Sequence, residues 1–307
     1  MKILHVDTGR GLRGGQRQLL MLLRGLKQRG HEQVLLAQDE VLRQWPGREV
    51  SAPALWRASR QVDIVHAHSG RAHTLAAQFC WGKPIVVSRR VAFPLNQGLL
   101  SRWKYGRANK LLAVSGYVRD QLIAAGIPQE KVCVVYDGVE SAELSGERVP
   151  AVTRLDRPLK VVTPRIDDVL KPSAVVAKAC ERIGAELILS GDLKRDIPRG
   201  DIFVYLSESE GLGSAVLLAM AHRKPVVASR VGGLPELVID QHTGLLADNT
   251  VESVTAAIER LAGDAELAQR CIDTAFERVS GQFTDAIMVE RTEAVYRSFL
   301  REPPATE

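Results

Sequence analysis

The sequence predicts an α/β protein built from two consecutive, doubly wound parallel-sheet domains. Short apolar segments rich in β-branched residues alternate with helical segments along the chain, and such alternation favours parallel sheets with right-handed crossovers. The segment DIFVYL at 201–206 shows no polar alternation, which is typical of a strand covered on both faces. A length of 307 residues accommodates two domains of about 150 residues each.

Six strands and four helices are expected in the first half of the chain. The strands are KILHVD, EQVLLAQ, DIVHAH, PIVVS, KLLAVS and KVCVVYD, which are short and bounded by turn residues. The helices run from about Gln16 to Arg29, His73 to Phe79, Gly98 to Ala108 and Gly116 to Ala125. Gly30 is expected to end the first helix, because a left-handed C-cap favours glycine.

A second series of strands follows a polar segment from Glu140 to Pro158 that contains two prolines and lacks periodicity. We place the domain boundary there, with the first domain in residues 1–148 and the second in residues 149–283. The expected strands of the second domain are LKVVTPR, AELILSG, DIFVYL, KPVVAS and GLLA. Helices are expected from about Val251 to Ala262 and from Ala265 to Val279.

The composition is that of an ordinary soluble α/β protein, with 45% hydrophobic, 25% charged and 5% aromatic residues. The four cysteines have no metal-binding or redox spacing and are interpreted as free thiols in a reducing compartment. No signal peptide or long apolar stretch is recognised. We therefore expect a cytoplasmic protein, either free or peripheral on the inner face of the membrane.

The charge is unevenly divided between the two halves. Residues 1–150 contain 22 Lys and Arg against 12 Asp and Glu, a net charge of +10, whereas the remainder has 19 against 24, a net charge of −5. A basic half indicates an anionic partner, such as a phosphate-linked acceptor or an anionic membrane surface. No nucleic-acid partner is expected, because no RNA-binding or helix-turn-helix motif is present. The alternative is that these arginines simply lie on solvated helix faces.

The segment from Tyr205 to Leu246 carries the clearest chemistry. Gly211 and Gly213 open a helix after a buried strand, and the unpaired N–H groups at a helix start favour a phosphate. Glu210, just before this turn, would repel a phosphate but can accept hydrogen bonds from sugar hydroxyls. A phosphate cradle beside a hydroxyl acceptor indicates a nucleotide-sugar pocket.

This segment resembles the donor-binding signature of the retaining glycosyltransferases of family four, which have the GT-B fold. The matching residues are Ser207, Glu210, Gly211, Gly213, Ala219, Met220, Ala221, Gly232, Gly233, Pro235 and Glu236. The start of the chain through its Gly14–Gly15 pair, and the segment DIVHAHS, also resemble the family. The resemblance implies two facing Rossmann-like domains, with a final helix at 284–302 that returns to the first domain.

The resemblance also implies roles for individual residues. Glu210 would orient the donor sugar, while Arg165 and Lys171 would stabilise the negative charge that grows on the leaving diphosphate. The remaining donor-binding residues would be Gly14, Gly15, Gly211, Leu212, Gly213, Ser214 and Glu236. Two alternatives stay open: Arg165 and Lys171 could form surface ion pairs with Asp167 or Asp168, and Glu236 could be a carboxylate favoured by its helix dipole.

The acceptor would be a saccharide, lipid-linked or part of a cell-envelope polysaccharide such as lipopolysaccharide, bound by the first domain. Its predicted contacts are Arg13, His68, Arg89 and Arg90. His66 and His68 share one strand face but lack a third ligand, so we interpret them as cleft-facing or structural histidines. Adjacent Asp167–Asp168 is not the spaced Asp-x-Asp of metal-dependent transferases. Neither a metal nor a cofactor is expected, since the nucleotide sugar is a substrate.

Several departures from the family pattern support an alternative function. Leu218 stands where the family has a second glutamate, and Arg89–Arg90 stand where it often has a histidine. Only LKRDIPRG separates Gly191–Asp192 from Asp201, which predicts a smaller second sheet. The alternative to a transferase is a non-catalytic binding or scaffold protein of GT-B shape. A third hypothesis, an NAD(P)-dependent dehydrogenase, would use the G-x-G-x-x-G pattern at 9–14 with Asp39.

Overall fold

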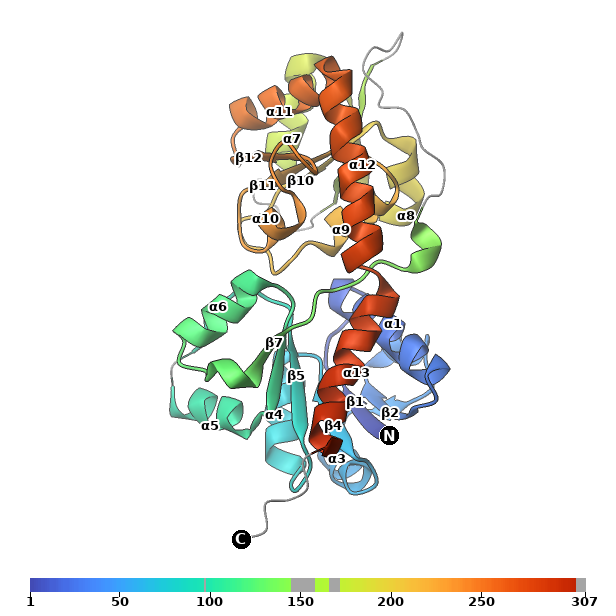
Figure 1. Cartoon of the computed structure of the whole chain (residues 1–307), viewed down its shortest axis with the longest axis vertical. Helices are drawn as coiled ribbons and strands as arrows, with labels where there is room; N and C mark the ends of the chain where they lie inside the picture. Colours follow the sequence, from blue (N-terminus) through green and yellow to red (C-terminus); the bar gives the residue numbers. More distant parts are fainter. Residues whose placement is uncertain (97, 145–157, 166–171, 302–307) are drawn as a thin grey trace. The chain divides into compact units, whose positions relative to one another are not determined.

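The computed structural model describes residues 1–96, 98–144, 158–165 and 172–301, and it confirms the predicted α/β class. The chain forms two compact units (Figure 1). Unit 1 combines Met1–Asp137 with the segment that begins at Asp285, and unit 2 is Gly138–Thr284. The contacts thus divide the chain after Asp137, whereas the predicted boundary at 148/149 lies outside the described residues.

Unit 1 contains a seven-stranded parallel sheet with the strand order β3-β2-β1-β4-β5-β6-β7. The strands are β1 (Lys2–Val6), β2 (Glu32–Ala37), β3 (Arg48–Glu49), β4 (Ile64–Ala67), β5 (Ile85–Arg89), β6 (Lys110–Ala113) and β7 (Val132–Val134). The helices are α1 (Gly14–Gln28), α2 (Asp39–Leu42), α3 (Ala52–Ser59), α4 (Gly70–Phe79), α5 (Leu99–Arg107), α6 (Gly116–Ala124), the 3₁₀ helix η1 (Gln129–Lys131) and α13 (Asp285–Arg301).

The six strands expected in this half are present, and β3 is an additional one. Pattern reading missed β3 because it has only two residues and both are exposed. It also missed α3. The side chain of Ser51 caps the start of this helix by accepting a hydrogen bond from Ala54 N. Gly30 adopts φ +79°, and its N–H reaches Lys27 O, which confirms the left-handed end of α1.

The C-terminal helix α13 completes the core of unit 1, and its return to the first unit, which the resemblance implied, is confirmed. Met288, Val289 and Tyr296 of α13 are buried in one cluster with Leu22 and Leu26 of α1. The two helices approach closely at Gly25, where an added Cβ would lie 2.4 Å from Val289 Cγ2. A side chain at position 25 would therefore push α13 away from α1.

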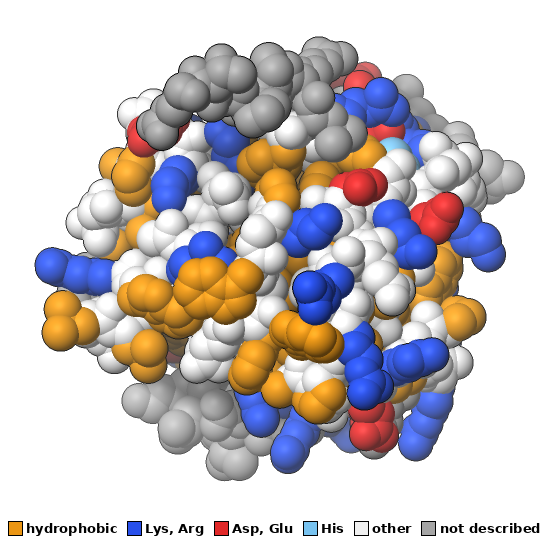
Figure 2. All heavy atoms as spheres, turned by 90° about the horizontal axis from the view of Figure 1, so that it is seen from below, with side chains coloured by type: hydrophobic (Ala, Val, Ile, Leu, Met, Phe, Trp, Pro, Cys, Tyr) orange, Lys and Arg blue, Asp and Glu red, His pale blue; other side chains and the backbone are white. Residues whose placement is uncertain are grey.

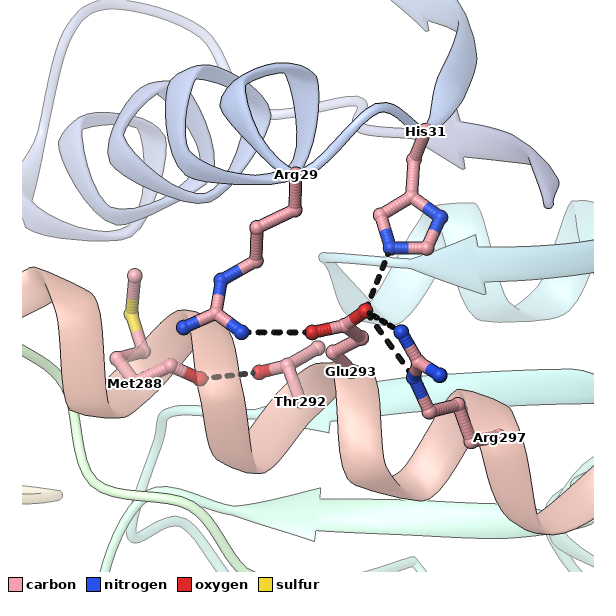
Figure 3. A network of polar contacts seen from close by, with 6 residues as sticks. All are labelled: Arg29, His31, Met288, Thr292, Glu293 and Arg297. Carbon is pink, nitrogen blue, oxygen red and sulfur yellow. Dashed lines mark hydrogen bonds and ion pairs between the residues drawn. The ribbon is translucent and has the colours of Figure 1, made fainter.

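A network of ion pairs around Glu293 holds the other side of α13 (Figure 3). The buried Glu293 carboxylate accepts hydrogen bonds from Arg29 Nη1 at 2.8 Å and from Arg297 Nη2 at 2.6 Å, and His31 Nε2 lies 2.8 Å away. Burial alone would raise the pKa of Glu293, but the hydrogen bonds from Arg297, His31 and Arg29 lower it to about 2. The Arg-Gly-His segment after α1 therefore anchors the last helix.

We expect Glu293→Gln to lower the free energy of unfolding by about 1.5–3 kcal/mol at neutral pH, because it removes charged hydrogen bonds from a buried site. The pKa of Glu293 is lower in the folded chain than the value of about 4.3 in an unfolded one. Its contribution is therefore complete above about pH 4.3 and is lost as the pH falls toward 2. Urea unfolding of both proteins from pH 7 to pH 3 should show their difference shrinking.

Glu290→Gln is the matched control, since Glu290 lies on the same helix and is exposed. It should change the free energy of unfolding by less than about 0.5 kcal/mol at every pH. A difference between wild type and Glu293→Gln that does not depend on pH would contradict the ion-pair explanation.

Unit 2 contains a five-stranded parallel sheet with the order β12-β11-β10-β8-β9. The strands are β8 (Lys160–Pro164), β9 (Glu186–Ser190), β10 (Ile202–Tyr205), β11 (Val226–Ser229) and β12 (Leu245–Ala247). The helices are η2 (Ser141–Glu143), α7 (Pro172–Ile183), α8 (Leu193–Asp196), η3 (Ile197–Arg199), α9 (Ser214–Ala221), α10 (Leu234–Leu237), α11 (Val251–Gly263) and α12 (Ala265–Gln282). The five strands are those expected, and the short connection between β9 and β10 is filled by α8 and η3.

Within the described residues, no helix has the length and apolar character needed to cross a membrane.

Candidate functional site

In unit 2, the predicted donor residues lie in turns that follow neighbouring parallel strands. Arg165 follows β8, Glu210 follows β10, and the pair Gly232–Gly233 follows β11. The carboxyl ends of these strands share one edge of the sheet because the strands are parallel. The chain places β9 on one side of β8 and β10 on the other. The β8–β10 boundary is thus the topological switch point, where ligands collect in open α/β sheets.

The Glu210 carboxylate is held by two hydrogen bonds. Tyr205 Oη donates to Glu210 Oε2 at 2.5 Å, and Gly211 N donates to Oε1 at 2.9 Å. A carboxylate has about four lone-pair sites, so each oxygen of the half-buried Glu210 retains capacity for a further donor. The Gly211 N–H already donates to Glu210. The backbone N–H groups that remain to bind an anion are therefore those that follow Gly211 in the chain.

Tyr205 contacts the candidate site through Glu210, and it was not identified from the sequence. Burial, followed by the negative charge of Glu210, raises the pKa of Tyr205, so its hydroxyl stays protonated and donates to Glu210. The available signal was a tyrosine in the otherwise apolar strand DIFVYL, because a buried phenol needs a hydrogen-bond partner.

The Gly232–Gly233 turn packs directly on the backbone of the Glu210 turn. An added Cβ at Gly232 would lie 2.0 Å from Glu210 O, and one at Gly233 would lie 2.1 Å from Gly211 O. Gly233 N also donates to Glu210 O at 3.0 Å. Gly232 has φ +57°, a left-handed value that favours glycine. The two glycines are thus required by the close approach of two turns.

The start of α9 has the features of an anion site. Its N-cap is Gly213, which makes no side-chain capping hydrogen bond and has φ +109°. No acidic residue lies in the first turn of α9. The N–H groups in the first turn of a helix have no acceptor within the helix, and the helix dipole attracts negative charge. The predicted contacts Leu212, Gly213 and Ser214 are all located at this helix start.

A side-chain network fixes the beginning of the same turn. Ser229 Oγ accepts a hydrogen bond from Ser207 N at 2.9 Å and donates to Asn249 Oδ1 at 2.5 Å. Asn249 Nδ2 in turn donates to Ser207 O at 2.9 Å. Both polar groups of the Ser207 backbone are therefore satisfied by side chains, one from the last residue of β11 and one from the turn after β12, and the turn is held in a fixed position.

The other predicted residues of unit 2 are placed as follows. Arg165 is exposed, and its backbone N–H donates to Ser190 O at 2.8 Å. Glu236 is half-buried in the first turn of the four-residue helix α10, a position compatible with either of its two proposed roles. Leu218 is half-buried on α9. Lys171 lies outside the described residues.

In unit 1, the glycine pair Gly14–Gly15 forms the first two residues of α1 rather than a loop before it. Arg13 is the N-cap residue of this helix, exposed and without a side-chain capping hydrogen bond. The preceding loop is organised by Gln16, whose Nε2 donates to Asp7 Oδ2 at 2.9 Å. An added Cβ at Gly9 would lie 2.0 Å from that nitrogen. The first glycine of the G-x-G-x-x-G pattern thus has a structural explanation within this loop, and the second, Gly11, has φ +78°, a left-handed value that favours glycine.

A third histidine joins the pair that the sequence singled out. The strands β1 and β4 pair with His5 opposite His66, and ring nitrogens of His5, His66 and His68 lie within 4.8 Å of one another. His5 Nδ1 is 3.0 Å from His68 Nε2, while His66 contacts the hydroxyls of Tyr296 at 2.5 Å and Ser88 at 2.8 Å. Burial lowers the pKa of all three histidines, which are therefore neutral. His68, predicted to contact the acceptor, is buried in this cluster.

Arg89 and Arg90 have partners that the sequence did not reveal. Arg90 Nε donates to Asp137 Oδ1 at 2.8 Å, and both side chains are largely buried. Burial raises the pKa of Asp137, and the neighbouring Arg90 opposes this shift. Arg89 Nη2 donates to Phe93 O at 2.5 Å. Arg90 also lies close to the predicted Gly15, whose added Cβ would be 3.9 Å from Arg90 Cδ.

Two family models match the chain. Residues 12–143 match Glycosyltransferase Family 4, and residues 190–278 match Glycosyl transferases group 1. The second match contains the Glu210 turn, α9 and the Gly232–Gly233 turn. The chain belongs to glycosyltransferase family 4.

A curated relative that the chain resembles is the capsular polysaccharide biosynthesis glycosyltransferase CapM of Staphylococcus aureus. It is 28% identical over 103 residues, which make up 33% of this chain. The chain spans only 27% of the length of CapM in this match.

Solved structures extend the likeness over nearly the whole chain. A glycosyltransferase from Rickettsia africae has a TM-score of 0.81 at 17% identity, with 98% of this chain and 99% of that chain covered. HepE of Anabaena in complex with UDP-glucose has a TM-score of 0.80 at 17% identity, with 97% and 100% covered. These family-4 units therefore have the GT-B fold, as the resemblance implied.

Proposed function

We propose that this family-4 chain transfers a sugar from a nucleoside diphosphate sugar to an acceptor hydroxyl, with retention at the anomeric carbon. The observation that carries the proposal is the Glu210 turn, in which a fixed carboxylate stands beside the uncapped start of α9. The carboxylate is suited to sugar hydroxyls, and the N–H groups at the start of α9 are suited to a diphosphate. The binding of UDP-glucose by HepE, a protein of the same fold, supports a nucleotide-sugar donor.

The chemistry requires no protein nucleophile. The bond between the anomeric carbon and the diphosphate oxygen breaks, and a bond to the acceptor oxygen forms on the same face of the sugar. The acceptor proton passes to an oxygen of the departing diphosphate. Negative charge grows on this leaving group, so the α9 amides and Arg165 stabilise the transition state more than the bound donor. Lys171 would add a second cation, and Glu210 would fix the sugar.

The acceptor is proposed to be a saccharide, either lipid-linked or part of a cell-envelope polysaccharide. The role of CapM in capsular polysaccharide biosynthesis supports this class. Arg13, exposed at the start of α1, is the predicted acceptor contact best placed to meet a ligand. His68 and Arg90, by contrast, already have buried partners.

A second candidate is a nucleotide-sugar-binding protein without transfer activity. Leu218 favours it, because this α9 residue replaces the carboxylate that the family pattern has at the corresponding position. Both candidates bind a nucleotide, and only one releases it from the sugar.

The test is a panel of UDP-, GDP- and ADP-sugars incubated with the full chain and with envelope lipids, read by product mass and by calorimetry. Binding together with release of nucleoside diphosphate and formation of a glycosylated product supports the transferase. Binding without release supports the second candidate. If none of the sugars binds, both candidates are wrong.

Tyr205→Phe is expected to lower donor turnover by about 10–100-fold, equivalent to the 1.5–3 kcal/mol of a hydrogen bond to a charged group. The ring and its packing are retained, while the hydroxyl that orients Glu210 is removed. Affinity for the nucleoside diphosphate, which lacks the sugar, should stay within about threefold by calorimetry. In a Glu210→Ala background the same change should have no further effect, and an additive loss would contradict the proposed action through Glu210.

A further inference from the structure

The helix α5 exposes apolar side chains on its outward side. Leu99 is 86% exposed, Leu100 66% and Trp103 38%, whereas Tyr105 is buried. At 3.6 residues per turn, positions 99, 100, 103 and 107 lie on one side of a helix and position 105 lies opposite. α5 thus buries Tyr105 against α4, where His73 Nε2 lies 3.0 Å from Lys104 O, and turns its leucines and Trp103 to the outside.

The apolar surface continues onto the turn after α4. Arg107, one helical turn beyond Trp103, places its guanidinium carbon 4.3 Å from the centroid of the Trp81 ring and donates to Cys80 O. Trp81 is itself 64% exposed. We call the residues Trp81, Leu99, Leu100, Trp103 and Arg107 the outer patch. It combines aliphatic and indole groups of unit 1 with the guanidinium of Arg107, which links α5 to the turn after α4.

The chain segment that carries the outer patch has no acidic residue. Between Asp63 and Asp120 it contains nine Lys and Arg and neither Asp nor Glu. Figure 2 views the protein from below and shows hydrophobic side chains interspersed with basic ones, while acidic ones are sparse on this face. Burial and the positive charge of the neighbouring Arg89 lower the pKa of Lys104, which shows that cations lie close together in this segment. The segment between Asp63 and Asp120 therefore has a net charge of +9, although Arg90 is paired with the carboxylate of Asp137.

We propose that the outer patch docks unit 1 onto a lipid bilayer that contains anionic phospholipids. Leu99 and Leu100 enter the boundary between headgroups and acyl chains, and the two tryptophans occupy the interface, where indoles are favoured. Arg102 and Arg107 contact lipid phosphates, and the excess of positive charge attracts the anionic surface. A nucleic acid would match the charge but not the two exposed leucines, which cannot stack on bases.

This inference does not depend on transfer activity, because it concerns a surface of unit 1 and not the Glu210 turn. It also differs from a membrane span, since α5 has only nine residues and would lie in the plane of the interface. Docking of this kind would place the protein where lipid-linked acceptors are concentrated.

Vesicle sedimentation tests the proposal with the full chain. Wild type should bind vesicles of 30% phosphatidylglycerol in phosphatidylcholine at 0.1 M NaCl, and binding should fall at least tenfold on pure phosphatidylcholine or at 0.5 M NaCl. The double variant Leu100→Gln/Trp103→Gln should lose at least tenfold in partition coefficient, and Arg102→Gln should lose a few fold, mainly at low salt. Brominated lipids should quench tryptophan fluorescence in wild type and less in the double variant.

Trp56→Gln is the matched control. Trp56 is also an exposed tryptophan of unit 1 stacked with an arginine, Arg60, but it lies on α3 outside the acid-free segment. The Trp56→Gln variant should have the same partition coefficient on anionic vesicles as wild type. The proposal is overturned if wild type ignores anionic vesicles, if the double variant binds as wild type does with an unchanged melting temperature, or if single-stranded DNA binds through the same residues while vesicles do not.

Discussion

Replacing Glu210 with Ala is expected to lower sugar transfer and donor hydrolysis by about 10²–10³-fold. The variant removes the carboxylate that Tyr205 and Gly211 N hold in place and that is proposed to position the donor sugar. Loss of orientation should affect the chemical step more than binding of the nucleotide, whose proposed contacts are at α9 and Arg165. The measurement is turnover of the active sugar donor together with calorimetric affinity for the nucleoside diphosphate, which should change less than about threefold.

Glu208→Ala is the control for this result. Glu208 lies in the same turn and is exposed, so its removal should leave turnover within about twofold of wild type. Glu210→Gln separates charge from shape, since a glutamine retains one acceptor oxygen for Tyr205, and it should be less impaired than the alanine variant. Turnover of Glu210→Ala equal to that of Glu208→Ala would remove Glu210 from the proposed site.

The second large effect is expected from Gly233→Ala. The added Cβ would lie 2.1 Å from Gly211 O and 3.1 Å from Leu212 Cα, and both contacts are with backbone, which cannot rotate away. The Glu210 and Gly232–Gly233 turns must separate, and the hydrogen bond from Gly233 N to Glu210 O is strained. We expect a loss of about 1–3 kcal/mol in the free energy of unfolding and a fall of about 10²-fold in turnover.

Gly191→Ala controls for the loss of a glycine in the same unit. Gly191 follows β9, has no positive φ, and an added Cβ there would meet nothing within 4 Å. The free energy of unfolding in urea and the turnover of the Gly191→Ala variant should match those of wild type. If Gly233→Ala behaves as Gly191→Ala does, the two turns are not packed as the structure places them.

The sequence predicted elements well where one segment alone determines them. The five strands of unit 2 and the left-handed end of α1 at Gly30 follow from local apolar runs and backbone preference. β3 was missed because two exposed residues of an edge strand carry no pattern, and its formation depends on pairing with β2. Long, apolar or glycine-marked features are visible in a sequence, whereas short edge features are not.

The sequence pointed to the residues of the candidate site, but not to the contacts among them. The motif located Glu210 and the glycine pair, yet the reason for two adjacent glycines appears only when one turn packs on the other. Tyr205 was hidden because its partner is five residues away across a turn, and His5 because its partners His66 and His68 become neighbours only through strand pairing. Contacts between segments distant in sequence depend on register and packing, which no local pattern encodes.

The discontinuous origin of unit 1 has a consequence for biosynthesis. The core cluster of unit 1 that contains Ile3 and Leu22 also contains Met288, Val289 and Tyr296 of α13. The ribosome synthesises α13 only after all of unit 2. At about 5–20 residues per second, roughly 10–30 s pass between completion of the first sheet and emergence of its covering helix. During this delay an apolar face stays uncovered on the nascent polypeptide, which makes it a natural client for a chaperone acting at the exit tunnel.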